Sequence, residues 1–225
     1  MSTLPFVADP HQSLQRARLD FFDHAGFGPS GGYDEPWAEA DFGSFRYRVP
    51  NGAARARALQ VHDLHHVVTG YATDWRGESE ISAWELGSGG PGPQPYAWVI
   101  SLWGLFVGLL TMPERVFRAF VRGRGSRNLY RARLDGSLLG QRVAQVQRSL
   151  AVQPAQAAGE SPWAPGTPRR LRMGDRLAFA GWTVAAMAWG LTGGLGVLAL
   201  VAAAGGRRLH GLFGCPLRCQ GTAAA

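Results

Sequence analysis

The sequence contains no lysine, and all 23 of its basic residues are arginine. Exclusive use of arginine is typical of a GC-rich genome, so we expect a bacterial source. Charged residues make up only 17% of the chain, below the usual quarter, while apolar residues make up 46%. This balance indicates a surface that is small, partly covered by a partner, or partly embedded in lipid.

Cysteine occurs only twice, and the chain begins without an apolar segment. Cys215 and Cys219 lie close to the end at a C-x-x-x-C spacing, which fits neither a zinc ribbon nor a thioredoxin-type motif. Asp9, Asp20 and Asp23 argue against a transit peptide, which is normally poor in acidic residues. We therefore expect an intracellular protein with reduced thiols.

Length and net charge limit the remaining classes. The 225 residues allow one domain with a sizeable core and an appendage. The net charge of +7 favours anionic lipid headgroups or phosphates as partners. Nucleic acid is not expected, because no binding motif accompanies the charge.

Four potential metal ligands stand in one stretch, VHDLHHVVTGYATDWRGE. His62, Asp63 and His66 are followed by eleven residues and then by Glu78. On an α-helix His66 lies about 40° round from His62 and Asp63 about 100° round, so all three can face one cavity. Gly70 is placed to end this helix, 69–77 reads as a loop, and Glu78 then opens a helix that runs back antiparallel.

These residue types favour a catalytic or mixed metal site over a closed structural one. Imidazole suits zinc, iron and cobalt, whereas structural zinc sites favour cysteine thiolates, and no cysteine lies nearby. Glu80 and Glu85 are candidate supporting groups, and His65 is a candidate proton carrier. The plainer interpretation is an exposed polar helix that happens to carry His and Asp.

The stretch resembles the coenzyme Q biosynthesis protein 4 family, whose motif is this same His-Asp-x-x-His pattern followed eleven residues on by Glu. The similarity includes Gly70 and Gly77 and extends over about 47–133. It implies that the metal ligands are His62, Asp63, His66 and Glu78, with zinc as the usual metal.

The family resemblance also implies a function. It implies that the protein acts on the head group of a polyprenylated ubiquinone precursor and removes the ring carboxylate at C1 oxidatively. The alternative within the same resemblance is a non-catalytic lipid-binding scaffold that presents the precursor to other quinone-biosynthesis proteins. Partners implied are the precursor, membrane lipids, those proteins and a second copy of the chain.

Two other readings share some of these residues. His62, His65 and His66 spell the His-x-x-His-His box of membrane desaturases, but such enzymes need several boxes, and only His11, His24 and His210 remain. HD-type phosphohydrolases also carry a His-Asp pair, with an upstream His and a distant Asp. His24 and Asp135 could be nominated there, although nothing around them supports it.

The chain as a whole predicts a mainly α fold, a helical metal-binding domain with a C-terminal hydrophobic helix. A short helix is expected near 12–24 and a short strand at 45–49, and Asn51 is placed to cap the metal helix. The predicted divisions are a mostly irregular N-terminal segment (1–50) and the metal-binding domain (51–140). A linker (141–176), a transmembrane helix (177–204) and a tail (205–225) follow.

Two stretches point towards a membrane. The uncharged run 96–112 could span a bilayer, but we favour a core or interfacial helix, followed by a basic amphipathic helix suited to a membrane surface. The 28 residues of 177–204 carry no charge and predict a transmembrane helix. Thirteen arginines from Arg115 to Arg176 place the metal site on the cytoplasmic face of the inner membrane.

Overall fold

The computed structural model describes residues 5–42, 45–152 and 172–204, with side chains described throughout except at 38–49 and 194–204. The described elements are mainly helical, as predicted. The helices are α1 (Leu14–Ala25), α2 (Ala53–Thr69), α3 (Trp75–Gly87), α4 (Pro95–Thr111), α5 (Pro113–Arg124), α6 (Gly136–Leu139), α7 (Val143–Ser149) and α8 (Met173–Ala204). Two strands, β1 (Trp37–Phe42) and β2 (Phe45–Pro50), pair antiparallel. The predicted tail 205–225, with Cys215 and Cys219, and residues 153–171 of the predicted linker lie outside the described residues.

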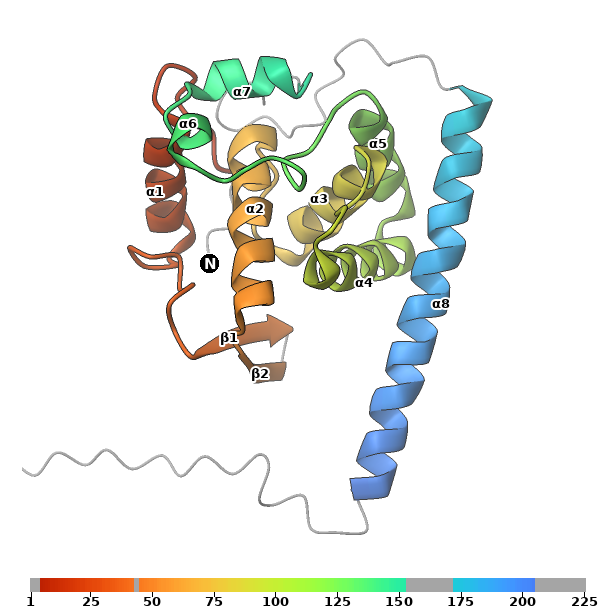
Figure 1. Ribbon diagram of the computed structural model, residues 1–225. Helices are drawn as coiled ribbons and strands as arrows, with labels where there is room; N and C mark the ends of the chain where they lie inside the picture. Colours follow the sequence, from red (N-terminus) through yellow and green to blue (C-terminus); the bar gives the residue numbers. More distant parts are fainter. Residues whose placement is uncertain (1–4, 43–44, 153–171, 205–225) are drawn as a thin grey trace, which may run out of the picture.

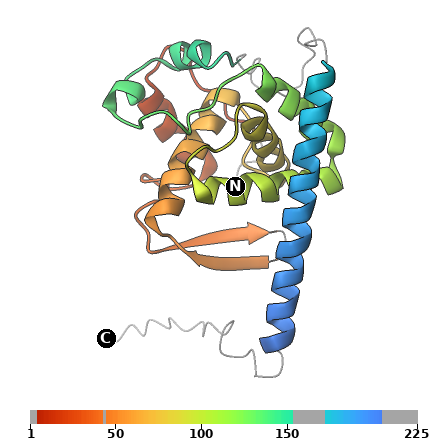
Figure 2. The ribbon, with the colours of Figure 1, turned by 45° about the vertical axis from the view of Figure 1, so that its right-hand side comes forward.

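The helices pack as a bundle around α2 and α3 (Figure 1). Helix α1 packs along α2, while α3 packs against α4 and α5. The short helices α6 and α7 contact α1, and α7 also covers α2. The hairpin β1–β2 lies at the opposite end of α2 from α7, and α8 runs along the edge of the bundle (Figure 2).

The two helices that carry the metal motif begin and end for local reasons. Helix α2 ends at Gly70, whose φ of 77° places it in the left-handed conformation that glycine adopts readily, as predicted. Its N-cap position is Gly52, not Asn51. Helix α3 starts at Trp75, because the Asp74 carboxylate accepts a hydrogen bond from the Gly77 N–H at 2.8 Å. Glu78 therefore lies in the first turn of α3, three residues after its start.

The N-terminal segment and the predicted linker contain more structure than expected. Helix α1 confirms the helix predicted near 12–24, and it begins where the Ser13 hydroxyl accepts from the Arg16 N–H. Helix α7 falls inside the range predicted as linker. It forms because Val143 and Val146, three residues apart, are both fully buried on one face.

The apolar run at 96–112 forms α4, and one face of this helix lies in the core. Ala97, Ser101, Leu105 and Gly108 are buried, as the spacing of a helix face requires. Helix α5 was predicted to lie on a membrane surface, but its apolar face is covered. Val116, Ala119 and Phe120 are buried against α3, and the Phe120 ring also lies 5.3 Å from that of Phe179 in α8.

The predicted transmembrane stretch forms the greater part of α8. One face of α8 packs against α4, with Trp182 stacked on Trp98 at 5.5 Å and Ala186 fully buried. Its other face leaves Leu177 and Val184 about two-thirds exposed, at 66% and 70%. Among the described residues, no helix has both the length and the apolar character needed to cross a membrane.

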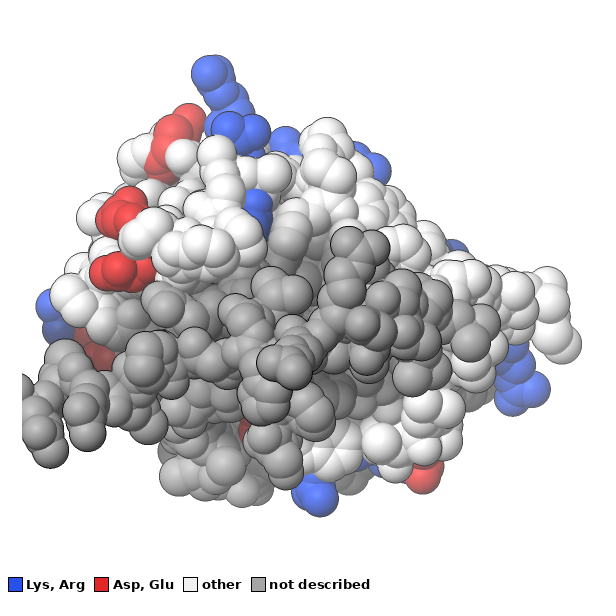
Figure 3. All heavy atoms as spheres, turned by 90° about the horizontal axis from the view of Figure 1, so that it is seen from below, with Lys and Arg blue, Asp and Glu red and all other residues white. Residues whose placement is uncertain are grey.

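Charged side chains of both signs are visible on the face of the molecule that is seen from below (Figure 3). Seen from below, acidic side chains gather along one side and arginines are spread around the edge (Figure 3). Several arginines pair with acids instead of facing solvent alone, such as Arg115 with the buried Glu80 and Arg124 with the buried Asp175.

The crossing of α3 and α5 leaves no room for a side chain at Gly123. A Cβ there would lie 2.3 Å from the carbonyl oxygen of Trp84. We therefore expect Gly123→Ala to lower the free energy of unfolding by about 3 kcal/mol, as overpacking against rigid backbone does. Chemical denaturation followed by circular dichroism measures the change. The control is Gly181→Ala in α8, where a Cβ would meet nothing within 4 Å. An equal effect of the two substitutions would contradict the proposed close packing.

Candidate metal centre

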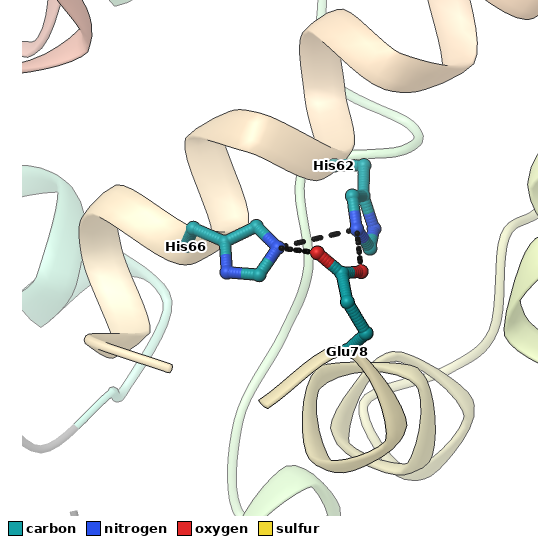
Figure 4. A group of neighbouring side chains, drawn as sticks. All are labelled: His62, His66 and Glu78. Atoms are coloured by element: carbon teal, nitrogen blue, oxygen red, sulfur yellow. Dashed lines mark hydrogen bonds and ion pairs between the residues drawn. The ribbon is translucent and has the colours of Figure 1, made fainter. Parts of the chain in front are cut away.

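His62 and His66 lie one turn apart on α2 and point their Nε2 atoms towards the same point (Figure 4). The two Nε2 atoms are 3.3 Å apart, and both residues are buried, with exposures of 5% and 1%. The two histidines therefore lie on one face of the helix, because a spacing of four residues returns a helical side chain to nearly the same direction.

Glu78 reaches the two imidazoles from the first turn of α3. Its Oε2 lies 3.0 Å from His62 Nε2, and its Oε1 lies 3.3 Å from His66 Nε2. One atom from each residue falls within 4.8 Å of the others, which is the spacing expected of ligands around one ion. The Glu78 side chain is 42% exposed, so solvent reaches the group from the α3 side.

The opposite nitrogen of each imidazole is held by the protein. His66 Nδ1 lies 2.9 Å from the backbone carbonyl oxygen of Tyr71, which can only accept, so Nδ1 carries a proton and Nε2 faces His62 and Glu78. His62 Nδ1 lies 2.9 Å from Glu85 Oε1. Outer hydrogen bonds of this kind, from Nδ1 to a carbonyl or carboxylate, orient histidines that bind metal through Nε2.

The electrostatics of the cluster call for a positive charge between these atoms. Burial lowers the pKa of His62, but the carboxylates of Glu85 and Glu78 outweigh it and raise that pKa well above its ordinary value. Burial raises the pKa of Glu78, but the neighbouring His66 and His62 more than reverse this and bring it to about 2. A proton on His62 supplies the positive charge in the protein alone, and a divalent cation would supply it in a metal site.

Glu85 supports the site from behind. Its side chain is fully buried, and its Oε1 accepts from Tyr130 Oη at 2.8 Å and from His65 Nδ1 at 2.7 Å as well as from His62. Ser101 Oγ donates to Oε2 at 2.8 Å. Burial raises the Glu85 pKa, but His62 and His65 together hold it well below its ordinary range, so the group is a carboxylate.

Two of the other candidate residues have different partners. Glu80 pairs with Arg115, 2.5 Å from its Nε, and is not one of the three residues that converge. His65 was a candidate proton carrier, but both of its nitrogens are engaged by the protein. Nδ1 bonds to Glu85, and Nε2 accepts from the Leu129 N–H at 2.9 Å. His65 thus ties the loop after α5 to the core.

Asp63 is buried beside the cluster but is not one of its three converging members. Its Oδ2 accepts a hydrogen bond from Tyr33 Oη at 2.5 Å. Two aromatic residues from the N-terminal segment thus border the site, because the ring of Phe21 also stacks on His66 at 5.6 Å. No local pattern connects Tyr33 or Phe21 with residues some 30 to 45 positions later.

The two alternative readings find no matching geometry in the described chain. His24 lies on α1 with its ring 5.6 Å from Phe6, and Asp135 caps the short helix α6. Neither belongs to the cluster with His62 that an HD-type phosphohydrolase would need. A desaturase box would need His65 to face the metal position together with His62 and His66. Here His65 faces Glu85 instead.

Compared with known proteins, the chain matches no family model, no curated protein and no solved structure. The resemblance to the coenzyme Q biosynthesis protein 4 family therefore rests on the motif itself and stays a prediction.

The charges of Glu78 and His62 predict how the free energy of unfolding of the metal-free protein depends on pH. With a chelator present, it should fall both at acid pH and at alkaline pH. Glu78 has a lowered folded pKa, so it stabilises the fold above its ordinary pKa of 4.5, and this contribution is lost as pH falls towards about 2. His62 has a raised folded pKa, so its contribution is complete below 6.5 and is lost as pH rises through the raised value. Denaturation from pH 2 to pH 9 measures both limbs.

A matched variant separates the cluster from the rest of the chain. Glu78→Gln should remove the loss of stability at acid pH that Glu78 causes. It should also reduce the loss at alkaline pH, because the raised pKa of His62 depends in part on Glu78. Unchanged pH dependence in Glu78→Gln would show that the limbs arise elsewhere.

Proposed function

We propose that the chain is a metal-dependent, membrane-associated protein of quinone biosynthesis that holds one divalent ion at His62, His66 and Glu78. The observation that carries the proposal is the pair of Nε2 atoms that converge with the Glu78 carboxylate while their Nδ1 atoms are held by Glu85 and Tyr71. Two nitrogens and a carboxylate are the ligand set of catalytic zinc sites, and iron or cobalt also accept it.

The donor set fits an ion that retains an open position. Three protein ligands leave room for a substrate, whereas a closed structural site would use four and would favour cysteine. The 42% exposure of the Glu78 side chain provides the approach. When bound, the ion would supply Lewis acidity towards a phenolate or carboxylate. The chain's own residues hold the imidazoles at fixed angles and keep the back of the site dry.

The substrate we propose is a polyprenylated quinone precursor, and the reaction is oxidative decarboxylation at C1 of the ring. The ring carboxylate leaves as carbon dioxide and a hydroxyl takes its place, with dioxygen as oxidant, two reducing equivalents and release of water. The motif resemblance supports this assignment. Exposed apolar side chains support contact with a polyprenyl tail or lipid, and they lie on α4 and α8 at Val99, Trp103, Leu110, Leu177, Val184, Trp189 and Leu191. The proposed location is the cytoplasmic face of the inner membrane of a bacterium.

The rival function is a non-catalytic lipid-binding scaffold for quinone-biosynthesis enzymes. One observation favours it, which is that Glu78 links α3 to His62 and His66 of α2. An ion between these residues would join two helices whether or not it performs chemistry. The two functions differ in whether the charge of Glu78 is needed after the ion is bound.

Metal content tests the site directly. Purified protein should carry about one divalent ion per chain, and His62→Ala/His66→Ala should lose it, because the third ligand alone cannot hold an ion. Glu85→Gln should weaken metal affinity by about 10- to 100-fold, as loss of an outer partner does. Elemental analysis and chelator competition measure both effects, with the exposed His11→Ala as control. Full occupancy in the double variant would end the assignment.

Complementation separates the catalyst from the scaffold. Glu78→Gln keeps the size of the side chain and one oxygen donor, but it removes the charge that tunes the Lewis acidity of the ion. An enzyme should then fold and bind metal more weakly, yet fail to restore quinone production in a strain lacking the gene, with a carboxylated precursor accumulating. Full rescue by metal-loaded Glu78→Gln would favour the scaffold.

A further inference from the structure

Helix α8 has two faces of different character. On its inner face Trp182 stacks on Trp98 at 5.5 Å and Ala186 is fully buried. A Cβ at Gly190 would lie 2.3 Å from the ring of Phe106, so this face packs closely on α4. The outer face lies about 180° round the helix and consists of the exposed residues Leu177, Gly181, Val184, Ala188 and Leu191. It points away from the bundle, along whose edge α8 runs (Figures 1 and 2).

The residues of the outer face follow a heptad spacing. Steps of four, three, four and three residues lead from Leu177 to Leu191, and the sequence continues the pattern at Leu195 and Leu198. A period of 3.5 residues, slightly shorter than the 3.6 of a straight helix, is that of helices wound around each other. A helix that lies on lipid needs only an apolar side and no such period. The spacing therefore indicates another helix as the partner of this face.

Large and small residues alternate on the outer face. Leu177, Val184 and Leu191 are 66%, 70% and 55% exposed. Gly181 and Ala188 stand between them, and a Cβ at Gly181 would meet nothing within 4 Å. In a parallel pair of identical helices like positions face each other, so large residues would meet large ones. In an antiparallel pair the two core positions of the heptad face each other, so each large side chain meets a small residue, as close packing requires.

We propose that the outer face of α8 binds the outer face of a second copy of this chain in antiparallel orientation. Val184 of each copy then lies opposite Ala188 of the other, and Leu191 lies opposite Gly181. Pairing would bury no charge, because 177–204 carry none. The two bundles do not obstruct each other, since each packs on the inner face of its own α8. Helix α8 lies outside the range 47–133 of the family resemblance, and the inference does not depend on the metal site.

The length of α8 sets the strength of this pairing. The helix has 32 residues and is about 48 Å long, of which the proposed register pairs about 40 Å. A strip of that length and about 10 Å wide covers about 400 Å² on each copy. The total is somewhat below the roughly 1,000 Å² of a stable interface, so we expect a dimer that dissociates on dilution. With this face covered, contact with lipid falls mainly to the exposed side chains of α4.

Light scattering coupled to size-exclusion chromatography measures the dimer. The full chain of 24.2 kDa should show about twice this mass when concentrated and approach it on dilution. Leu191→Glu should raise the dissociation constant of the dimer by about 100-fold, because it places an unpaired charge in the paired face. Leu110→Glu on α4 is the matched control. It makes the same change at a similarly exposed position, 62% against 55%, and should leave the dimer unchanged.

Ala188→Leu separates helix pairing from binding to lipid. The larger side chain makes the outer face more apolar, so it would strengthen binding to phosphatidylcholine/phosphatidylglycerol vesicles if lipid covered this face. In the antiparallel pair the same side chain collides with Val184 of the second copy. Dimerisation should then weaken by about tenfold or more, as overpacking does.

Cross-linking tests the orientation. In a background of Cys215→Ser/Cys219→Ser, an equimolar mixture of the Val184→Cys and Ala188→Cys proteins should form the mixed disulfide faster than either protein cross-links to itself. Only the mixed pair comes within disulfide reach in the proposed register. Faster cross-linking of each protein to itself would show a parallel pair and overturn the proposed orientation.

The remaining outcomes are also decisive. A chain that stays at 24.2 kDa when concentrated, or a Leu110→Glu effect as large as that of Leu191→Glu, would overturn the inference. Stronger vesicle binding by Ala188→Leu would overturn it in favour of lipid. If Leu191→Glu does not fold, as judged by circular dichroism, Ala188→Leu decides alone. The proposed metal ligands lie on α2 and α3, so metal content tests the proposed function separately.

Discussion

The buried carboxylate of Glu85 is the constraint around which the interior is arranged. A charge with no solvent access is costly unless it is paired and hydrogen-bonded, and Glu85 meets this requirement with partners from three other parts of the chain. His62 and His65 come from α2, Ser101 from α4 and Tyr130 from the segment after α5. Each of these elements is thereby positioned relative to α3. The same carboxylate fixes the ring of His62, so the core and the metal centre share one anchor.

The centre is rigid on one side and accessible on the other. Glu85 and the carbonyl of Tyr71 hold the inner nitrogens, and the ring of Phe21 covers His66. Glu78 closes the outer side but leaves 42% of its side chain exposed. Such an arrangement preorganises the imidazoles, so little orientation entropy would be lost when an ion binds.

Three arginines of α5 bind groups on other helices. Arg115 and Arg124 pair with carboxylates that are almost fully buried, and Arg122 donates to the carbonyl of Thr69 at the end of α2. The apolar side chains that stay exposed lie mainly on α4 and α8, and Leu177 stands two residues from Asp175, which pairs with Arg124.

The sequence by itself determined the parts that depend on local periodicity. The four-residue step from His62 to His66, the end of α2 at Gly70 and the mainly helical fold follow from helix geometry and from the conformational freedom of glycine. Asp63 belongs to the predicted ligands because its position on the helix permits it. Only the tertiary structure gives that carboxylate a partner, because the loop held by Asn51 brings Tyr33 to it. It also decided that Glu85 contacts His62, that Glu80 pairs with Arg115 and that α5 packs its apolar face inward. These contacts join residues far apart in the chain, so they depend on how the helices pack and not on any spacing within one helix.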